Sequence, residues 1–133
     1  MNSSESQRKP LSILVVEDNA INLRLILAAL IRLGYKVDSA QNGQIAIEKY
    51  IANKYDVILM DIMMPVMDGL SATKEIRRIE KERGYPQGKK VKIIAITANA
   101  FEDDRSRFSE AGMDHFMNKP VEIEELQKIL NGI

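Results

Sequence analysis

The sequence predicts an α/β fold in which helices cover both faces of a parallel β-sheet. Short apolar runs alternate with longer stretches of helical periodicity along the whole chain. This strict alternation requires crossovers that place the helices on the two faces of a parallel sheet. The 133 residues suit a single core. With 45% hydrophobic and 29% charged residues, the composition is ordinary for a globular protein.

The predicted strands are apolar runs that are too short for helices. They cover residues 13–16, 37–40, 57–60, 93–96 and 115–117. Continuous runs of this kind are typical of strands that are buried on both faces. The functional crevice of such a sheet lies beyond the carboxyl ends of its strands, so the residues that follow each run are the candidates for a functional site.

The predicted helices have apolar residues at helical spacing, and they cover residues 20–33, 44–52, 71–83, 102–111 and 123–130. Gly34 and Gly112 follow the first and the fourth helix at positions where glycine commonly ends a helix. Residues 84–88 are interpreted as a surface loop. The basic run at residues 89–92 is interpreted as a solvated strand entrance rather than a binding patch.

The two ends of the chain and its composition exclude several classes of protein. Residues 1–10 are polar and are expected to be a flexible tail or the end of a linker, which leaves residues 11–133 as the domain. The 19 basic and 19 acidic side chains balance, so no nucleic-acid partner and no membrane contact are expected. Cysteine is absent, which excludes disulfides and thiolate chemistry. Without a secretory signal or a spanning segment, the cytoplasm is the expected compartment.

Polar side chains with complementary chemistry follow four of the predicted strands. Glu17 and Asp18 follow the first, Asp61 the third, Thr97 ends the fourth, and Lys119 comes shortly after the fifth. Each has an ordinary explanation when taken alone, as a helix cap, a backbone partner or a surface charge. Together they favour a site. Crowded carboxylates repel one another unless a hard cation such as Mg²⁺ binds them, and an Asp beside the metal can attack phosphorus.

Four segments carry a resemblance to the receiver domain of two-component signalling, over about residues 11–130. They read ILVVEDN at residues 13–19, LMDIMMPVMDG at 59–69, ITA at 96–98 and NKP at 118–120. The chain is most similar to receivers of hybrid sensor histidine kinases or of single-domain phosphorelay regulators. The resemblance implies a flavodoxin-like (βα)5 three-layer sandwich with the strand order 2-1-3-4-5.

The resemblance also implies a role for each site residue. Asp61 corresponds to the phosphoacceptor, Asp18 to a direct metal ligand, and Glu17 to a ligand that acts through a water. The backbone carbonyl of Met63 would complete the protein ligands of Mg²⁺. Lys119 corresponds to the amine of the family, and the bond that joins it to Pro120 is expected to be cis.

A switch is the second implication of the resemblance. Thr97 corresponds to the switch hydroxyl and Phe116 to the aromatic switch residue, although a plain core ring would explain Phe116 equally well. In the family the hydroxyl moves toward the phosphoryl group and the ring turns inward, which alters the surface that residues 98–111, 115–117 and 121–130 form here. This surface, called α4–β5–α5 in the family, is also where a homodimer could form.

The predicted helix at residues 20–33 is unusually apolar, and two stripes are assigned to it. The stripe expected to pack on the sheet consists of Leu25, Ala29 and Leu33 with Ile26 and Leu30. The stripe expected to be exposed consists of Leu23, Leu27 and Ile31. Large exposed apolar patches usually mark partner sites, so we expect the second stripe to dock a helical phosphodonor. The only histidine, His115, is interpreted as structural, so the donor is a histidine kinase or a histidine phosphotransfer domain.

Other functions compete with the phosphoacceptor hypothesis. A Mg²⁺-dependent aspartyl-phosphate phosphatase usually carries a second Asp two residues after the nucleophile, but Met63 stands there and cannot transfer a proton. A flavodoxin-like nucleotide module would not place Glu17 and Asp18 where its phosphate loop belongs. A phosphorylation-independent interaction module would not need an intact site. The hypothesis therefore describes a domain that catalyses only its own phosphorylation and dephosphorylation, alone or as part of a hybrid sensor kinase.

Overall fold

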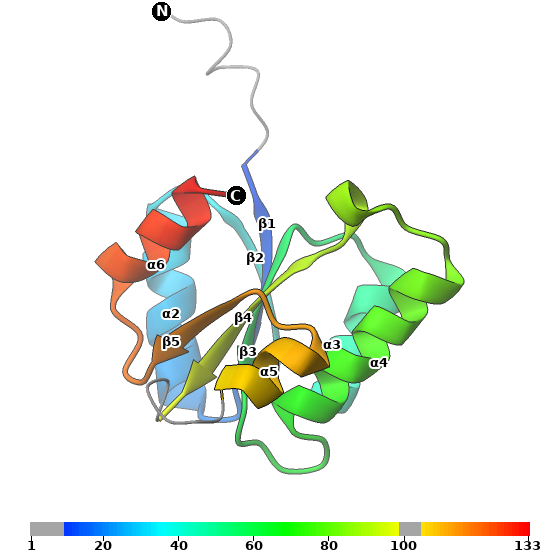
Figure 1. The fold of residues 1–133 in the computed structure, drawn as a ribbon. Helices are drawn as coiled ribbons and strands as arrows, with labels where there is room; N and C mark the ends of the chain where they lie inside the picture. Colours follow the sequence, from blue (N-terminus) through cyan, green and yellow to red (C-terminus); the bar gives the residue numbers. More distant parts are fainter. Residues whose placement is uncertain (1–9, 99–104) are drawn as a thin grey trace, which may run out of the picture.

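The computed structural model describes residues 10–98 and 105–133, and it contains one five-stranded parallel sheet with the order β2-β1-β3-β4-β5 (Figure 1). The strands are β1 (Ser12–Val16), β2 (Lys36–Ala40), β3 (Val57–Asp61), β4 (Lys92–Thr97) and β5 (His115–Asn118). The helices are α2 (Ala20–Arg32), α3 (Gly43–Ala52), α4 (Gly69–Glu82), α5 (Arg105–Ala111) and α6 (Ile123–Asn131), with a short 3-10 turn η1 (Gln87–Lys89). The predicted fold class and strand order are confirmed.

The sheet separates two hydrophobic cores. In Figure 1, α2 and α6 cover one face of the sheet, and α3, α4 and α5 cover the other. Alternate residues of the central strand serve the two cores, because successive side chains of a strand point to opposite faces. Val57 and Leu59 join the core beneath α2 and α6, whereas Ile58 and Met60 join the other. The edge strand β2 is only partly buried, so the expectation of burial on both faces holds for the inner strands.

Most predicted boundaries are right within two residues, and side-chain caps explain the helix starts. Asn19, Asn42 and Asp68 each accept a hydrogen bond from a backbone N–H in the first turn of α2, α3 and α4. Gly34 and Gly112 have φ angles of 95° and 110°, as the predicted helix ends require. Residues 1–9 of the predicted tail, which runs to residue 10, and residues 102–104 of the predicted fourth helix lie outside the described residues.

The two stripes assigned to α2 are partly wrong. Leu23 is buried, with only 8% of its surface exposed, and Leu27 is half-buried, so neither belongs to a free stripe. Leu25, expected to pack, is 66% exposed. A step of four residues turns a helix by about 400°, so a stripe at that spacing drifts by about 40° per step and leaves the buried face. The exposed apolar stripe consists of Ile21, Leu25, Ala28 and Ile31.

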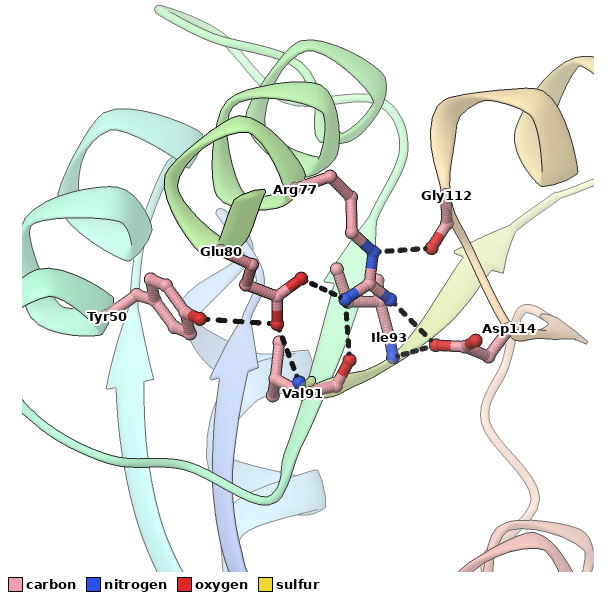
Figure 2. Close-up of polar contacts among 7 residues, drawn as sticks. All are labelled: Tyr50, Arg77, Glu80, Val91, Ile93, Gly112 and Asp114. Carbon is pink, nitrogen blue, oxygen red and sulfur yellow. Dashed lines mark hydrogen bonds and ion pairs between the residues drawn. The ribbon is translucent and has the colours of Figure 1, made fainter. Parts of the chain in front are cut away.

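A polar network ties α4 to the amino ends of β4 and β5 (Figure 2). The half-buried Arg77 donates hydrogen bonds to the carbonyl oxygens of Gly112, at 2.9 Å, and Val91, at 2.8 Å. It also forms ion pairs with Glu80, at 2.7 Å, and Asp114, at 2.8 Å. Glu80 is fully buried and accepts a hydrogen bond from the Val91 N–H at 2.7 Å. The network therefore fixes this end of the sheet against the C-terminal end of α5.

Candidate phosphorylation site

The carboxyl ends of β1, β3, β4 and β5 bring the predicted site residues together at one edge of the sheet. Asp61 and Thr97 are the last residues of β3 and β4, and Lys119 directly follows β5. The backbone N–H of Lys119 donates to the carbonyl oxygen of Thr97 at 2.8 Å, which fixes the end of β5 against β4. Four strands that are far apart in sequence thus position the side chains of one site.

Three carboxylates form an acidic cluster at this edge. Glu17, Asp18 and Asp61 each offer an oxygen, and these three oxygens lie within 4.8 Å of one another. Asp61 is 1% exposed and Glu17 4% exposed, whereas Asp18 is open to solvent. The Oε2 atom of Glu17 is buried and has no hydrogen-bond partner among the described residues. A buried, unpartnered oxygen within a set of hard oxygen donors fits a divalent cation of the Mg²⁺ type or its bound water.

The Lys119 amine neutralises part of this negative charge. Its Nζ lies 2.9 Å from Oδ2 of Asp61 and 3.8 Å from Oε1 of Glu17. Burial alone would lower the pKa of Lys119, but the hydrogen bond to Asp61 and the nearby carboxylates hold it above its usual value. For Glu17, burial and the neighbouring Asp61 raise the pKa to about 7. Without a metal, this carboxyl therefore carries a proton for part of the time near neutral pH.

The loop after Asp61 places backbone groups close to this carboxylate. The Met63 N–H donates to Oδ1 of Asp61 at 3.3 Å, while the Met63 side chain is 76% exposed. The Met63 carbonyl as a metal ligand stays a prediction. Gly69 closes the loop against the strand, since a Cβ there would lie 2.3 Å from the carbonyl oxygen of Asp61. Sequence reasoning used this glycine only as part of a motif and missed its steric role beside the nucleophile.

The two predicted switch residues lie on neighbouring strands, Thr97 at the end of β4 and Phe116 within β5. Thr97 is nearly buried at the end of β4. The Phe116 ring packs against Phe108 of α5, with 6.0 Å between the ring centroids, and the Arg105 guanidinium lies 5.2 Å from the Phe116 centroid. Phe108 and Arg105 were missed, because nothing in the sequence pairs α5 with β5. The switch roles of Thr97 and Phe116 stay predictions.

A small cavity of about 270 Å³ lies beside the acidic cluster. Glu17, Asn22 and Lys119 are its polar lining residues, and Leu25 and Val121 are among those that contribute apolar walls. Leu25 belongs to the exposed stripe of α2, so this cavity opens next to the apolar surface. The predicted cis bond between Lys119 and Pro120 is present. Histidine 115 lies at the first position of β5, at the opposite end of that strand from Lys119.

Residues 13–131 match the response regulator receiver domain family. The chain belongs to this family. The receiver is 40% identical over 140 residues to histidine protein kinase 1 of Candida albicans, an alignment that covers 98% of this chain but 6% of that protein. It is 39% identical to hybrid signal transduction histidine kinase I of Dictyostelium discoideum, covering 96% of this chain and 7% of that kinase. The chain thus spans less than a tenth of the length of these relatives.

Solved structures show the same fold. The receiver domain of sensor histidine kinase PA1611 from Pseudomonas aeruginosa PAO1, crystallised with magnesium in its active-site cleft, has a TM-score of 0.78 and 43% identity, covering 93% of this receiver and 97% of that chain. The Ssk1 receiver of Saccharomyces cerevisiae, in complex with the histidine phosphotransfer protein Ypd1, has a TM-score of 0.86 and 30% identity. The match covers 92% of this receiver and 87% of that chain. None of the helices described in this receiver is long and apolar enough to cross a membrane.

Proposed function

We propose that this receiver takes a phosphoryl group from a phosphohistidine onto Asp61, with Mg²⁺ held by the acidic cluster. The observation that carries the proposal is the position of Asp61, which is buried at a strand end between two further carboxylates and the Lys119 amine. Glu17, Asp18 and Asp61 would hold the metal together with the Met63 carbonyl. When bound, Mg²⁺ would offset the negative charge on the transferring phosphoryl oxygens.

The transfer exchanges one bond to phosphorus for another. A carboxylate oxygen of Asp61 forms the new bond, while the phosphorus–nitrogen bond of the donor breaks and the imidazole leaves with the electron pair. Lys119 is paired with Asp61 at 2.9 Å before transfer and can then pair with a phosphoryl oxygen instead. Thr97 would donate its hydroxyl to another phosphoryl oxygen. The movement of these two side chains would couple the new charge to Phe116 and to the surface formed by α5, β5 and α6, through which a homodimer could form.

The phosphodonor is a histidine kinase or a histidine phosphotransfer domain. The exposed stripe of α2 supports this, since its Leu25 lines the cavity at the acidic cluster. Met63 and Val66, in the loop that follows Asp61, are also exposed and add to this apolar rim. The proposed docking surface therefore keeps Ile31 from the predicted stripe but replaces Leu23 and Leu27 with Ile21, Leu25 and Ala28. Alone or as part of a longer protein, in the cytoplasm, the receiver would catalyse only its own phosphorylation and dephosphorylation.

Intact mass after incubation with acetyl phosphate and Mg²⁺ tests the proposal. The parent chain should gain one phosphoryl group, and Asp61→Asn should gain none. Asp68→Asn is a matched control, because asparagine also caps α4 and this exposed carboxylate lies outside the cluster. Its mass gain should equal that of the parent. A folded parent that gains nothing would support the phosphorylation-independent interaction module instead, and rapid continuous release of inorganic phosphate would support the phosphatase.

A further inference from the structure

A second cavity lies at the opposite end of the sheet from Asp61. It has a volume of about 750 Å³ and lies beside the amino ends of β1, β3 and β4, where Leu11, Asp56 and Lys92 line it. Cavities of about 300–1,000 Å³ are typical of small-molecule sites. Four lysines line it, namely Lys54, Lys89, Lys90 and Lys92, and Tyr85 and Pro86 contribute a less polar wall. We call this cavity the basic hollow.

The charge of the basic hollow is not compensated within the part of the chain that the structure describes. None of its four lysine amines forms an ion pair with a described residue, whereas Lys49 and Lys119 are both paired. Asp56 is the one acidic side chain among the described residues that line the basic hollow, and its Oδ2 accepts the Ser12 N–H at 2.7 Å; Ile133, the last residue of the sequence, lines it too. The whole chain has a formal net charge of zero, so four amines at one end create a local positive field that attracts anions.

The backbone that carries two of these lysines is held rigidly. Val91, between Lys90 and Lys92, donates its N–H to Glu80 at 2.7 Å and accepts from Arg77 at 2.8 Å, as Figure 2 shows. The Lys92 N–H donates to the carbonyl oxygen of Asp56 at 3.0 Å. Lys90 lies in a bend just before β4 and Lys92 is the first residue of that strand, and both line the basic hollow. A site held in place before binding loses less entropy when its ligand arrives.

We propose that the basic hollow binds a phosphate-bearing small molecule of nucleotide size. The lysine amines would contact the phosphate groups, for which lysine is a common partner, and Tyr85 and Pro86 would pack against the less polar part of the ligand. This site is separate from the acidic cluster, where three carboxylates repel a free anion. It goes beyond the phosphoryl transfer proposed for Asp61 and does not depend on it.

Amide chemical shifts of the full chain, titrated with ADP, test this site. EDTA in the buffer keeps divalent cations away from the acidic cluster. ADP should shift the amides of Gly88, Lys90 and Lys92 saturably, pyrophosphate should bind more weakly, and adenosine should leave them unchanged. Lys90→Gln and Lys92→Gln should each weaken the binding of ADP about fivefold, because each removes one positive charge that attracts the phosphate groups in water.

Lys74→Gln is the matched control, because Lys74 is an exposed lysine of α4 outside the basic hollow and should leave the ADP affinity unchanged. If Lys74→Gln weakened the binding of ADP as much as Lys90→Gln does, the proposed site would be wrong. Chemical-shift changes confined to residues around Asp61, or no saturable change at all, would also overturn the proposal. Equal affinities for ADP and pyrophosphate would overturn the role of the less polar wall. Binding of a single-stranded oligonucleotide that strengthens with its length would overturn the small-molecule ligand.

Discussion

Removal of the Arg77 guanidinium should cost this receiver a large part of its stability. Arg77→Met keeps most of the side-chain volume but leaves Glu80, which is fully buried, without its cation at 2.7 Å. Breaking a buried pair from one side costs about 3–5 kcal/mol, because the remaining charge stays buried and uncompensated. The carbonyl oxygens of Gly112 and Val91 lose their side-chain donor as well. The free energy of unfolding of a typical domain is about 5–15 kcal/mol in total, so a loss of this size is readily measured.

Urea unfolding, followed by circular dichroism, measures the effect. Arg78→Met is a matched control on the same helix, because Arg78 is 53% exposed and its ion pairs with Glu75 and Glu82 lie on the surface. Its cost should stay below about 1 kcal/mol. Adding Glu80→Gln to Arg77→Met should recover part of the loss, since the unpaired charge is then gone. A loss below about 1 kcal/mol for Arg77→Met, or no recovery in the double variant, would refute the reasoning.

Three further predictions follow from other residues. Thr73→Val should stabilise the chain by about 1 kcal/mol in the same unfolding assay, because the buried Thr73 hydroxyl has no partner among the described residues. Leu25→Glu should slow phosphoryl transfer from a phosphorylated histidine phosphotransfer protein at least about tenfold, which corresponds to a loss of about 1.4 kcal/mol. The rate of phosphorylation by acetyl phosphate should not change. Ile51→Glu, an exposed position on α3, should leave both rates unchanged. Since the pKa of Glu17 is raised to about 7, protons compete with Mg²⁺ below that pH. Mg²⁺ affinity, measured by calorimetry, should therefore fall between pH 8 and pH 6, and Glu17→Gln should remove this dependence.

The strands and the site could be predicted from local sequence, because both depend on short segments. A buried parallel strand is recognised as an apolar run, and the carboxyl ends of such strands must meet at one edge of the sheet. Glu17, Asp61 and Thr97 could therefore be assigned to one site before any distance between them was known. The rotation of α2 could not be predicted. Almost every residue of that helix is apolar, so the pattern fits several orientations, and only packing against the sheet selects the one that buries Leu23.

The contacts between segments that are distant along the chain could not be predicted from the sequence either. Arg77, Val91 and the neighbouring Gly112 and Asp114 belong to three parts of the chain, and no spacing rule relates these parts. Gly112 was assigned to a helix end for its backbone angle, yet a Cβ there would also lie 2.6 Å from Cγ of Arg77. The identity of this glycine therefore has two physical causes, and only the backbone angle could be predicted from its place after a helix.

The proposed chemistry and the choice of partner would depend on different residues of this receiver. Asp61 and Glu17 are almost fully buried, so a protein partner could not contact them directly, whereas Leu25 and Met63 are exposed. A donor must therefore dock on the rim and project the phosphoryl group inward, and a small acyl phosphate can enter without touching the rim. Substitutions on the rim should then change which protein donates without changing the reaction at Asp61. The separate response of Leu25→Glu to a protein donor and to acetyl phosphate measures this division directly.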